Sequence, residues 1–314
     1  VYEAAIDDDG KEGKPVRLTT GLLAHSISLA RDAHTLAYAS YTPAGNVWVV
    51  PLSSTGSVSM TSATQLTHGT DVIEEASVSP DGHSILITAN RTGYSNLYTI
   101  PINGGPAVQI TFDTTDIFNP AWSRDGREIV FHRTGDTRSY IVAASGGLPT
   151  ALPLSGRTNR SDWSPDGNAL VAESHVDPQA HLTIMRRTSS GWGPPRPLAG
   201  TPYSLQPAWS RDGRWIAFLA NIGANLDSVG IEVIPAGGGS ARILARAPAS
   251  TTTVSLSRPI WSADSRAIYY RKSDPDGAVE IWKISVDGGS PLLQIRSDDP
   301  DRRPGSDASL FSVV

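Results

Sequence analysis

Six polar residues recur at one position of a repeated sequence pattern, and their types suit ligand binding. They are Ser26, Glu75, Asn119, Arg160, Gln206 and Arg258. The guanidinium groups of Arg160 and Arg258 could hold a carboxylate through forked hydrogen bonds, with Glu75 as the counter-charge. If the fold brings the six side chains to one axis, they form the mouth of a ligand site. Polar residues also line water-filled channel entrances that bind no ligand, so that alternative stays open.

Two of the acidic residues near this position could instead bind a metal ion. Glu74 and Glu75 are the only adjacent carboxylates in this part of the repeat, and His25 stands at the place that corresponds to Glu74. Carboxylate oxygens suit hard cations such as calcium or manganese. Paired acidic residues are more often solvated. We therefore predict no cofactor and keep a divalent cation at Glu74, Glu75 and His25 as the alternative.

Several kinds of catalysis lack their residues in this sequence. The chain contains no cysteine, which excludes thiolate chemistry, disulfides and cysteine-held metals. It also lacks the His-Glu-x-x-His pattern of zinc peptidases and the Gly-x-Ser-x-Gly elbow of serine hydrolases. We therefore name no catalytic residue.

The elements that must position these side chains come from an internal repeat. Segments such as 121–131 (AWSRDGREIVF) and 162–172 (DWSPDGNALVA) align on one aspartate, which recurs every 41 to 52 residues as Asp32, Asp81, Asp125, Asp166, Asp212 and Asp264. Because Pro or Arg, Asp and Gly follow one another between two apolar stretches, each segment predicts a tight turn between two strands. The aspartates are predicted to be turn residues, and the recurring tryptophans to be wedges between adjacent sheets.

Two more strands follow in each unit. Apolar segments such as 96–102 (NLYTIPI) and 230–236 (GIEVIPA) predict a third strand, and segments such as 108–113 (VQITFD) predict a fourth. A period near 45 residues with four strands is typical of the blade of a β-propeller. The sequence therefore predicts an all-β protein, with residues 1–314 as a single β-propeller domain of four-stranded blades.

The repeats resemble those of TolB-type β-propellers, with their Pro-x-Trp-Ser-Pro-Asp-Gly core. The match is close at residues 207–218 (PAWSRDGRWIAF) and weakest at residues 28–38, and the resemblance covers about residues 15–297. Similar repeats occur in periplasmic TolB, in secreted propellers, in the gating domains of prolyl-oligopeptidase-like enzymes, in amidohydrolase-linked propellers and in oligogalacturonate lyases. The resemblance therefore implies the fold but not one activity.

The count of blades depends on the chain ends. Segments 1–6 and 15–20 read as third and fourth strands, and residues 308–314 could add an inner strand. A ring closes well when both ends build one blade, because the pairing removes open sheet edges. We therefore predict seven blades, with 1–20 and 298–314 as closing segments. Six blades with residues 1–20 as an N-terminal flap is the alternative.

The composition of the chain narrows the classes of partner that it could bind. The net charge of −5 disfavours a nucleic-acid surface, and the apolar runs are too short to span a membrane. The first ten residues lack the basic head and apolar stretch of a secretion signal. We expect a monomer, and the resemblance to TolB-type propellers implies a bacterial periplasmic or secreted protein.

Three functions follow from these observations. The first is a non-catalytic binding or scaffold module that takes a protein, a small anion or a sugar at the channel mouth. The second is a polysaccharide lyase or hydrolase with its site in the channel. The third is the gating propeller of a larger prolyl-oligopeptidase-like or amidohydrolase protein.

Overall fold

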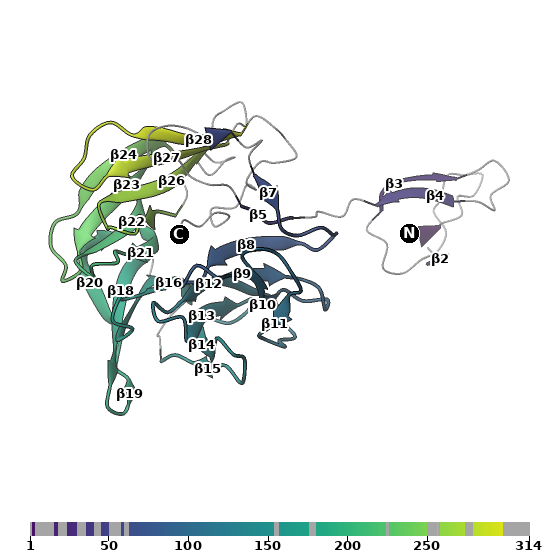
Figure 1. The fold of residues 1–314 in the computed structure, drawn as a ribbon, viewed down its shortest axis with the longest axis horizontal. Coiled ribbons are helices and arrows are strands. Elements are labelled where there is room, and N and C mark those ends of the chain that lie inside the picture. Colours follow the sequence, from purple (N-terminus) through teal and green to yellow (C-terminus); the bar gives the residue numbers. More distant parts are fainter. Residues whose placement is uncertain are drawn as a thin grey trace, which may run out of the picture. The chain divides into compact units, whose positions relative to one another are not determined.

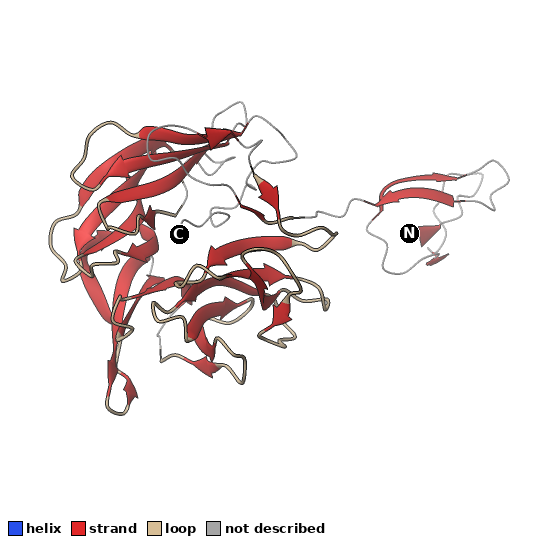
Figure 2. Cartoon of the chain, viewed as in Figure 1, coloured by secondary structure: helices blue, strands red, loops and turns tan. Residues whose placement is uncertain are grey.

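The computed structural model describes most of the chain. The described residues are 2–3, 16–17, 24–29, 36–40, 45–49, 58–59, 63–153, 157–175, 180–223, 226–249, 256, 258–273 and 279–297. They divide into two compact units, residues 1–44 and 45–314. The elements of this part of the chain are strands joined by turns and loops, as Figure 2 shows, and no helix in it is long and apolar enough to cross a membrane.

The larger unit contains five sheets with the strand order of propeller blades (Figure 1). Blade A contains β8 (Ile73–Val78), β9 (Ser84–Ala89), β10 (Asn96–Pro101) and β11 (Val108–Gln109), and blade B contains β12 (Ile117–Trp122), β13 (Glu128–Arg133), β14 (Ser139–Ala143) and β15 (Thr150–Ala151). Blade C contains β16 (Arg157–Trp163), β17 (Ala169–His175), β18 (Ala180–Thr188) and β20 (Arg196–Pro202), with β19 (Gly191–Trp192) beside β18. Blade D contains β21 (Ser204–Trp209), β22 (Trp215–Ile222), β23 (Ser228–Pro235) and β24 (Arg242–Pro248), and blade E contains β25 (Ile260–Trp261), β26 (Ala267–Ser273), β27 (Val279–Ser285) and β28 (Leu292–Ser297).

The N-terminal strands pair only two by two. They form the pairs β1 (Tyr2–Glu3) with β2 (Val16–Arg17), β3 (Ala24–Leu29) with β4 (Leu36–Ser40), and β5 (Trp48–Val49) with β7 (Thr64–Gln65). Five four-stranded blades therefore stand among the described residues, where the sequence predicted seven or, alternatively, six. The count differs because these pairs do not join into further four-stranded sheets, and because the predicted closing segment 298–314 lies outside the described residues.

One connection between distant segments was not predicted. Strand β6 (Val58–Ser59) lies parallel to β28 and adds a fifth strand to blade E. A segment from between β5 and β7 thus covers the outer edge of the last blade. Covering this edge removes unpaired backbone groups that could otherwise recruit another strand.

The Ser-x-Asp turns of blades A to E have one hydrogen-bond pattern, as the repeat predicted. The serine hydroxyl donates to the aspartate Oδ1 at 2.5–2.7 Å. The same oxygen accepts the backbone N–H two residues later at 3.0–3.1 Å. In Asp81, Asp125, Asp166 and Asp264 the serine hydroxyl is the main cause of a lowered carboxyl pKa. These aspartates therefore stabilise the turns between the first and second strands of the blades.

The repeat tryptophans lie between adjacent blades, as predicted. Trp122, Trp163 and Trp261 each donate an indole N–H to a carbonyl oxygen in the first strand of the preceding blade, at 3.3, 3.1 and 2.9 Å. Each of the four clusters between neighbouring blades contains one repeat tryptophan, with Trp209 in the cluster between blades C and D. Burial of these large rings holds each blade at a fixed angle to the next.

Candidate functional site

The first strand of each of blades A to D carries an irregularity at the position singled out in the sequence. The register shifts between residues 73 and 75, 118 and 121, 158 and 161, and 205 and 208. Asn119 and Gln206, which stand at these shifts before a proline, have positive φ angles of 54° and 52°. A β-bulge re-aims side chains and is frequent beside binding sites. Here it places the predicted residues where the first strands converge.

Three of the six predicted residues meet directly. Arg160 of β16 donates from Nη2 to Glu75 Oε1 of β8 at 3.2 Å, and the same Nη2 donates to the Asn119 side chain of β12. The side chains of Arg160 and Glu75 are 6% and 8% exposed. One guanidinium therefore links blades A, B and C, and Glu75 is its counter-charge.

Arg258 belongs to the same cluster, through a residue that the sequence did not single out. Asp162 Oδ1 lies 3.5 Å from Arg258 Nη2, and Asp162 Oδ2 lies 3.3 Å from Arg124 Nη2. Asp162 Oδ2 also accepts the backbone N–H of Trp209 at 2.7 Å. This buried carboxylate thus holds two guanidinium groups and the first strand of blade D.

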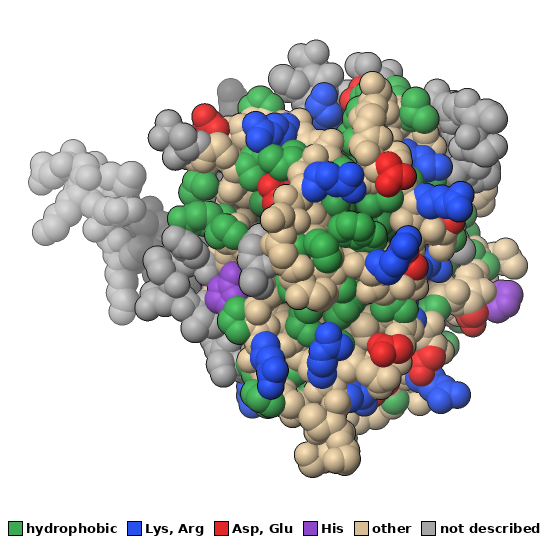
Figure 3. All heavy atoms as spheres, turned by 90° about the vertical axis from the view of Figure 1, so that its left-hand side faces the viewer, with side chains coloured by type: hydrophobic (Ala, Val, Ile, Leu, Met, Phe, Trp, Pro, Cys, Tyr) green, Lys and Arg blue, Asp and Glu red, His purple; other side chains and the backbone are tan. Residues whose placement is uncertain are grey.

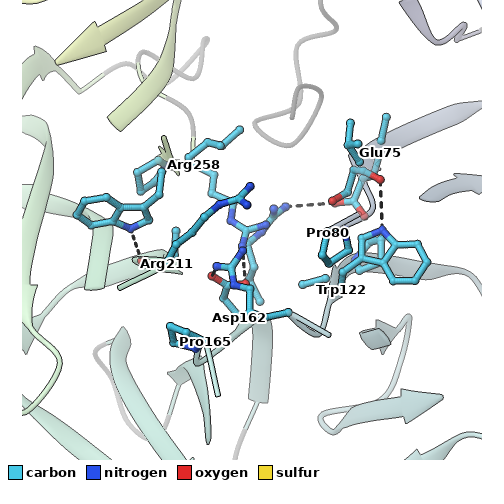
Figure 4. A pocket seen from close by; sticks show the side chains of 18 residues that line it. Glu75, Pro80, Trp122, Asp162, Pro165, Arg211 and Arg258 are labelled. Carbon is cyan, nitrogen blue, oxygen red and sulfur yellow. Dashed lines mark hydrogen bonds and ion pairs between the residues drawn. The ribbon is translucent and has the colours of Figure 1, made fainter. Parts of the chain in front are cut away.

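These side chains line a cavity of about 280 Å³, which we call the arginine cavity. Its charged lining residues are Arg124, Arg160, Arg211, Arg258, Glu75 and Asp162. Figure 4 shows Arg211 and Arg258 reaching from one side toward the centre, above Asp162, while Pro80 and Trp122 stand on the opposite side. Among the described lining residues, four positive charges face two negative ones, a surplus of two positive charges in a chain of net charge −5.

Arg258 remains charged at neutral pH although its pKa is lowered. Burial is the main cause that lowers the pKa of Arg258 to about 10; Arg160 and Arg124 lower it further, and Asp162 opposes them. Burial also lowers the pKa of Arg211, and the nearby Arg124 adds to the effect. Guanidinium groups crowded in this way are stabilised by any anion that enters.

A second cavity, of about 540 Å³, shares Glu75 and Arg160 with the first. Glu173, a buried residue of β17, accepts hydrogen bonds there from the side chains of Asn159 at 3.4 Å and His175 at 2.7 Å, and from the backbone N–H of Gln206 at 3.1 Å. Gln206 lines this cavity but not the arginine cavity. The carboxylate of Glu173 is therefore already engaged by protein donors.

The remaining predicted residues have separate outcomes. Ser26 and His25 lie on β3 in the unit 1–44, and their side chains lie outside what the structure describes. Glu74 is exposed at the second cavity, and Glu75 bonds to Arg160. Within the described residues, no three His, Asp or Glu side chains cluster as a metal site. A calcium or manganese ion at Glu74, Glu75 and His25 stays a prediction.

The sequence did contain a signal for the residues that were missed. At the turn position occupied by Pro80 and Pro165 in blades A and C, blades B and D have Arg124 and Arg211. At the place of Asp162, blades B and D have alanine. A residue that differs from its counterparts in the other repeats, where the turn does not require the difference, is a candidate for binding. Comparison of the repeats position by position would have found Arg124, Arg211 and Asp162.

Comparison with known proteins agrees with this architecture. The TolB β-propeller domain model (PD40) matches residues 2–225, which is most of the chain. The chain belongs to the TolB β-propeller domain family. Among solved structures, TolB from Acinetobacter baumannii superposes on this TolB-type propeller with a TM-score of 0.63 at 18% identity, over 76% of this chain and 57% of that one.

The other similar proteins include TolB homologues, an uncharacterized peptidase and a lyase. The propeller is 25% identical over 147 residues to a TolB homologue of Chlorobium luteolum, and 26% identical over 195 residues to the uncharacterized peptidase YuxL of Bacillus subtilis. These matches cover 44% and 58% of the chain but only 32% and 26% of the relatives. An oligogalacturonate lyase in complex with manganese has a TM-score of 0.53 at 15% identity, over 81% of this chain and 73% of its own. At that identity the likeness shows the fold alone.

Proposed function

We propose that this TolB-type propeller is a non-catalytic binding module that takes an anionic group in the arginine cavity. The observation that carries the proposal is the surplus of positive charge in a partly enclosed cavity, where four arginines face two carboxylates. Guanidinium groups bind carboxylates and phosphates through paired hydrogen bonds, and a low-dielectric surrounding strengthens them. The anionic group can belong to a small molecule, an acidic sugar or an acidic segment of a protein partner, because the cavity recognises the charge that these share.

The face of the protein in Figure 3 differs from the arginine cavity in its mixture of charges. Figure 3 shows the face over blades C and D, where Lys and Arg side chains lie among acidic and hydrophobic ones. Mixed charges of this kind are ordinary for a soluble surface. On this face the basic side chains are therefore interspersed with acidic ones, unlike those of the arginine cavity.

Arg211 is the residue through which the proposal is tested most cleanly. It lines the arginine cavity, is partly buried, and makes no hydrogen bond or ion pair to another described residue. Removing it should leave the links between blades intact. Arg160 and Arg258, by contrast, hold other blades through Glu75 and Asp162.

The experiment is a thermal-shift screen followed by isothermal titration calorimetry, with phosphate, sulfate, dicarboxylates and uronic-acid oligomers as probes. We expect at least one anion to raise the melting temperature, since a ligand that binds only the folded state stabilises it. Arg211→Met should weaken that binding about tenfold or more, as expected for loss of a charge-assisted hydrogen bond. Arg127→Met removes the same charge from a side chain that is 86% exposed, and should bind like the wild type. Equal binding by all three proteins would refute the proposal.

A gating role in a larger hydrolase is the second candidate. It is supported by the match to the uncharacterized peptidase YuxL, of which the matched segment is 26%. Sequencing the gene on both sides of the codons for residues 1–314 tests it: a hydrolase domain in the same reading frame would favour gating. We further propose a periplasmic or secreted location, supported by the similarity to bacterial TolB homologues, which cell fractionation would test.

A further inference from the structure

The arginine cavity has a defined deficit of negative charge. Glu75 forms an ion pair with Arg160, and its charge also acts on Arg258. The other carboxylate, Asp162, faces Arg124 through one oxygen and Arg258 through the other, and it also accepts the backbone N–H of Trp209. Arg211 lines the same space. Among the described lining residues, four guanidinium groups therefore share two carboxylates, which is a surplus of two positive charges.

The guanidinium groups of this set lie near one another. Arg124 Nη2 reaches past blade C to the carbonyl oxygen of Trp209 in blade D, at 2.9 Å. Asp162 of blade C brings Arg258 to the same place. Arg211 is close enough to Arg124 and Asp162 to feel both charges. The surplus charge is therefore concentrated in one cluster, and one compact group can contact it.

The order of residues around the turns limits the size of that group. The same turn position carries Pro80, Arg124, Pro165 and Arg211 in blades A to D, and all four line the cavity. The prolines are rigid and lack a backbone N–H, so they add no donor for a second polar group. A cavity of about 280 Å³ is at the small end of ligand pockets, which start near 300 Å³.

We infer that the ligand presents a compact dianionic group, either a phosphate or sulfate group or two carboxylates on a short chain. The inference rests on the proposed function and adds the charge of the ligand. Two negative charges would neutralise the surplus of the described lining, whereas a single negative charge would leave one positive charge uncompensated. The two kinds of dianion share this charge but differ in shape.

Calorimetry with two matched pairs of probes tests the inference. Sulfate is compared with methyl sulfate, and succinate with succinamate, because each pair differs by one negative charge and little else. We expect the dianion of at least one pair to bind about tenfold tighter than its monoanion at low salt. The pair that shows the preference identifies the tetrahedral group or the dicarboxylate.

Variants locate the effect and keep the outcomes distinct. Arg211→Met should reduce the preference for the dianion, Arg211→Lys should retain part of it, and Arg127→Met should leave it unchanged, with melting temperatures confirming that each variant folds. Equal binding of dianion and monoanion would overturn the inference and leave the proposed function standing. A preference that persists in Arg211→Met would also overturn it. If no anion binds at all, both fail.

Discussion

We predict that the buried side chain of His132 makes folding of the propeller sensitive to acid above the pH range in which carboxyl groups titrate. His132 of β13 is fully buried, and its Nδ1 lies 3.5 Å from Ser139 Oγ. Its Nε2 is buried and has no hydrogen-bond partner among the described residues. Burial is the main cause that lowers its pKa to about 3, and the charge of Arg160 in the arginine cavity lowers it further.

The sign and size of the effect follow from this pKa. The folded protein keeps His132 neutral down to about pH 3, whereas an unfolded chain protonates it near pH 6.5. The neutral imidazole therefore contributes stability above pH 6.5, and that stability is lost as the pH falls toward 3. Each pH unit in this window costs about 1.4 kcal/mol of unfolding free energy, so pH 4 should cost roughly 3 kcal/mol relative to pH 7.

Urea unfolding at a series of pH values measures the effect. Between pH 6.5 and 4 the unfolding free energy of the wild type should fall more steeply than that of His132→Leu, which cannot titrate. The difference in slope, rather than the stability at one pH, is the result, because the substitution also changes packing against Phe118. Parallel curves for the two proteins would refute the reasoning. The NMR signal of the His132 ring should likewise not titrate above about pH 4.

Two further substitutions test the turn motif and the arginine cavity. Asp166→Ala should lower the unfolding free energy by about 1 kcal/mol, because it removes the acceptor for Ser164 Oγ and for the backbone N–H of Asn168. Asp166→Asn keeps one side-chain oxygen and should lower the unfolding free energy less. Equal urea midpoints for the two variants would contradict the role of this carboxylate in the turn. Asp162→Asn should destabilise the protein by about 3 kcal/mol, since two partly buried arginines lose their buried carboxylate partner. It should also tighten anion binding several-fold in calorimetry, because the repulsion between the anion and Asp162 is removed. Weaker binding by a folded Asp162→Asn protein would contradict the charge count.

The sequence by itself determined the repeating unit. The alternation of apolar residues, the Asp-Gly turns and the recurrent tryptophans are local signals, because a turn or a strand depends on residues close together in the chain. They predicted four strands to each blade, the role of the turn aspartates and the position of the tryptophans between blades. The shared repeat position also predicted that six polar side chains converge, and three of them, Glu75, Asn119 and Arg160, meet directly.

Only the tertiary structure decided how the charges are shared. Asp162 binds Arg124 from a turn 38 residues away, and β6 pairs with β28 across most of the chain. Such contacts depend on the angle between blades and on which distant segments meet, and no local pattern encodes either. From the sequence alone, Arg124 and Arg211 look like ordinary turn residues. It becomes part of a cation cluster only when successive blades bring these side chains to one axis.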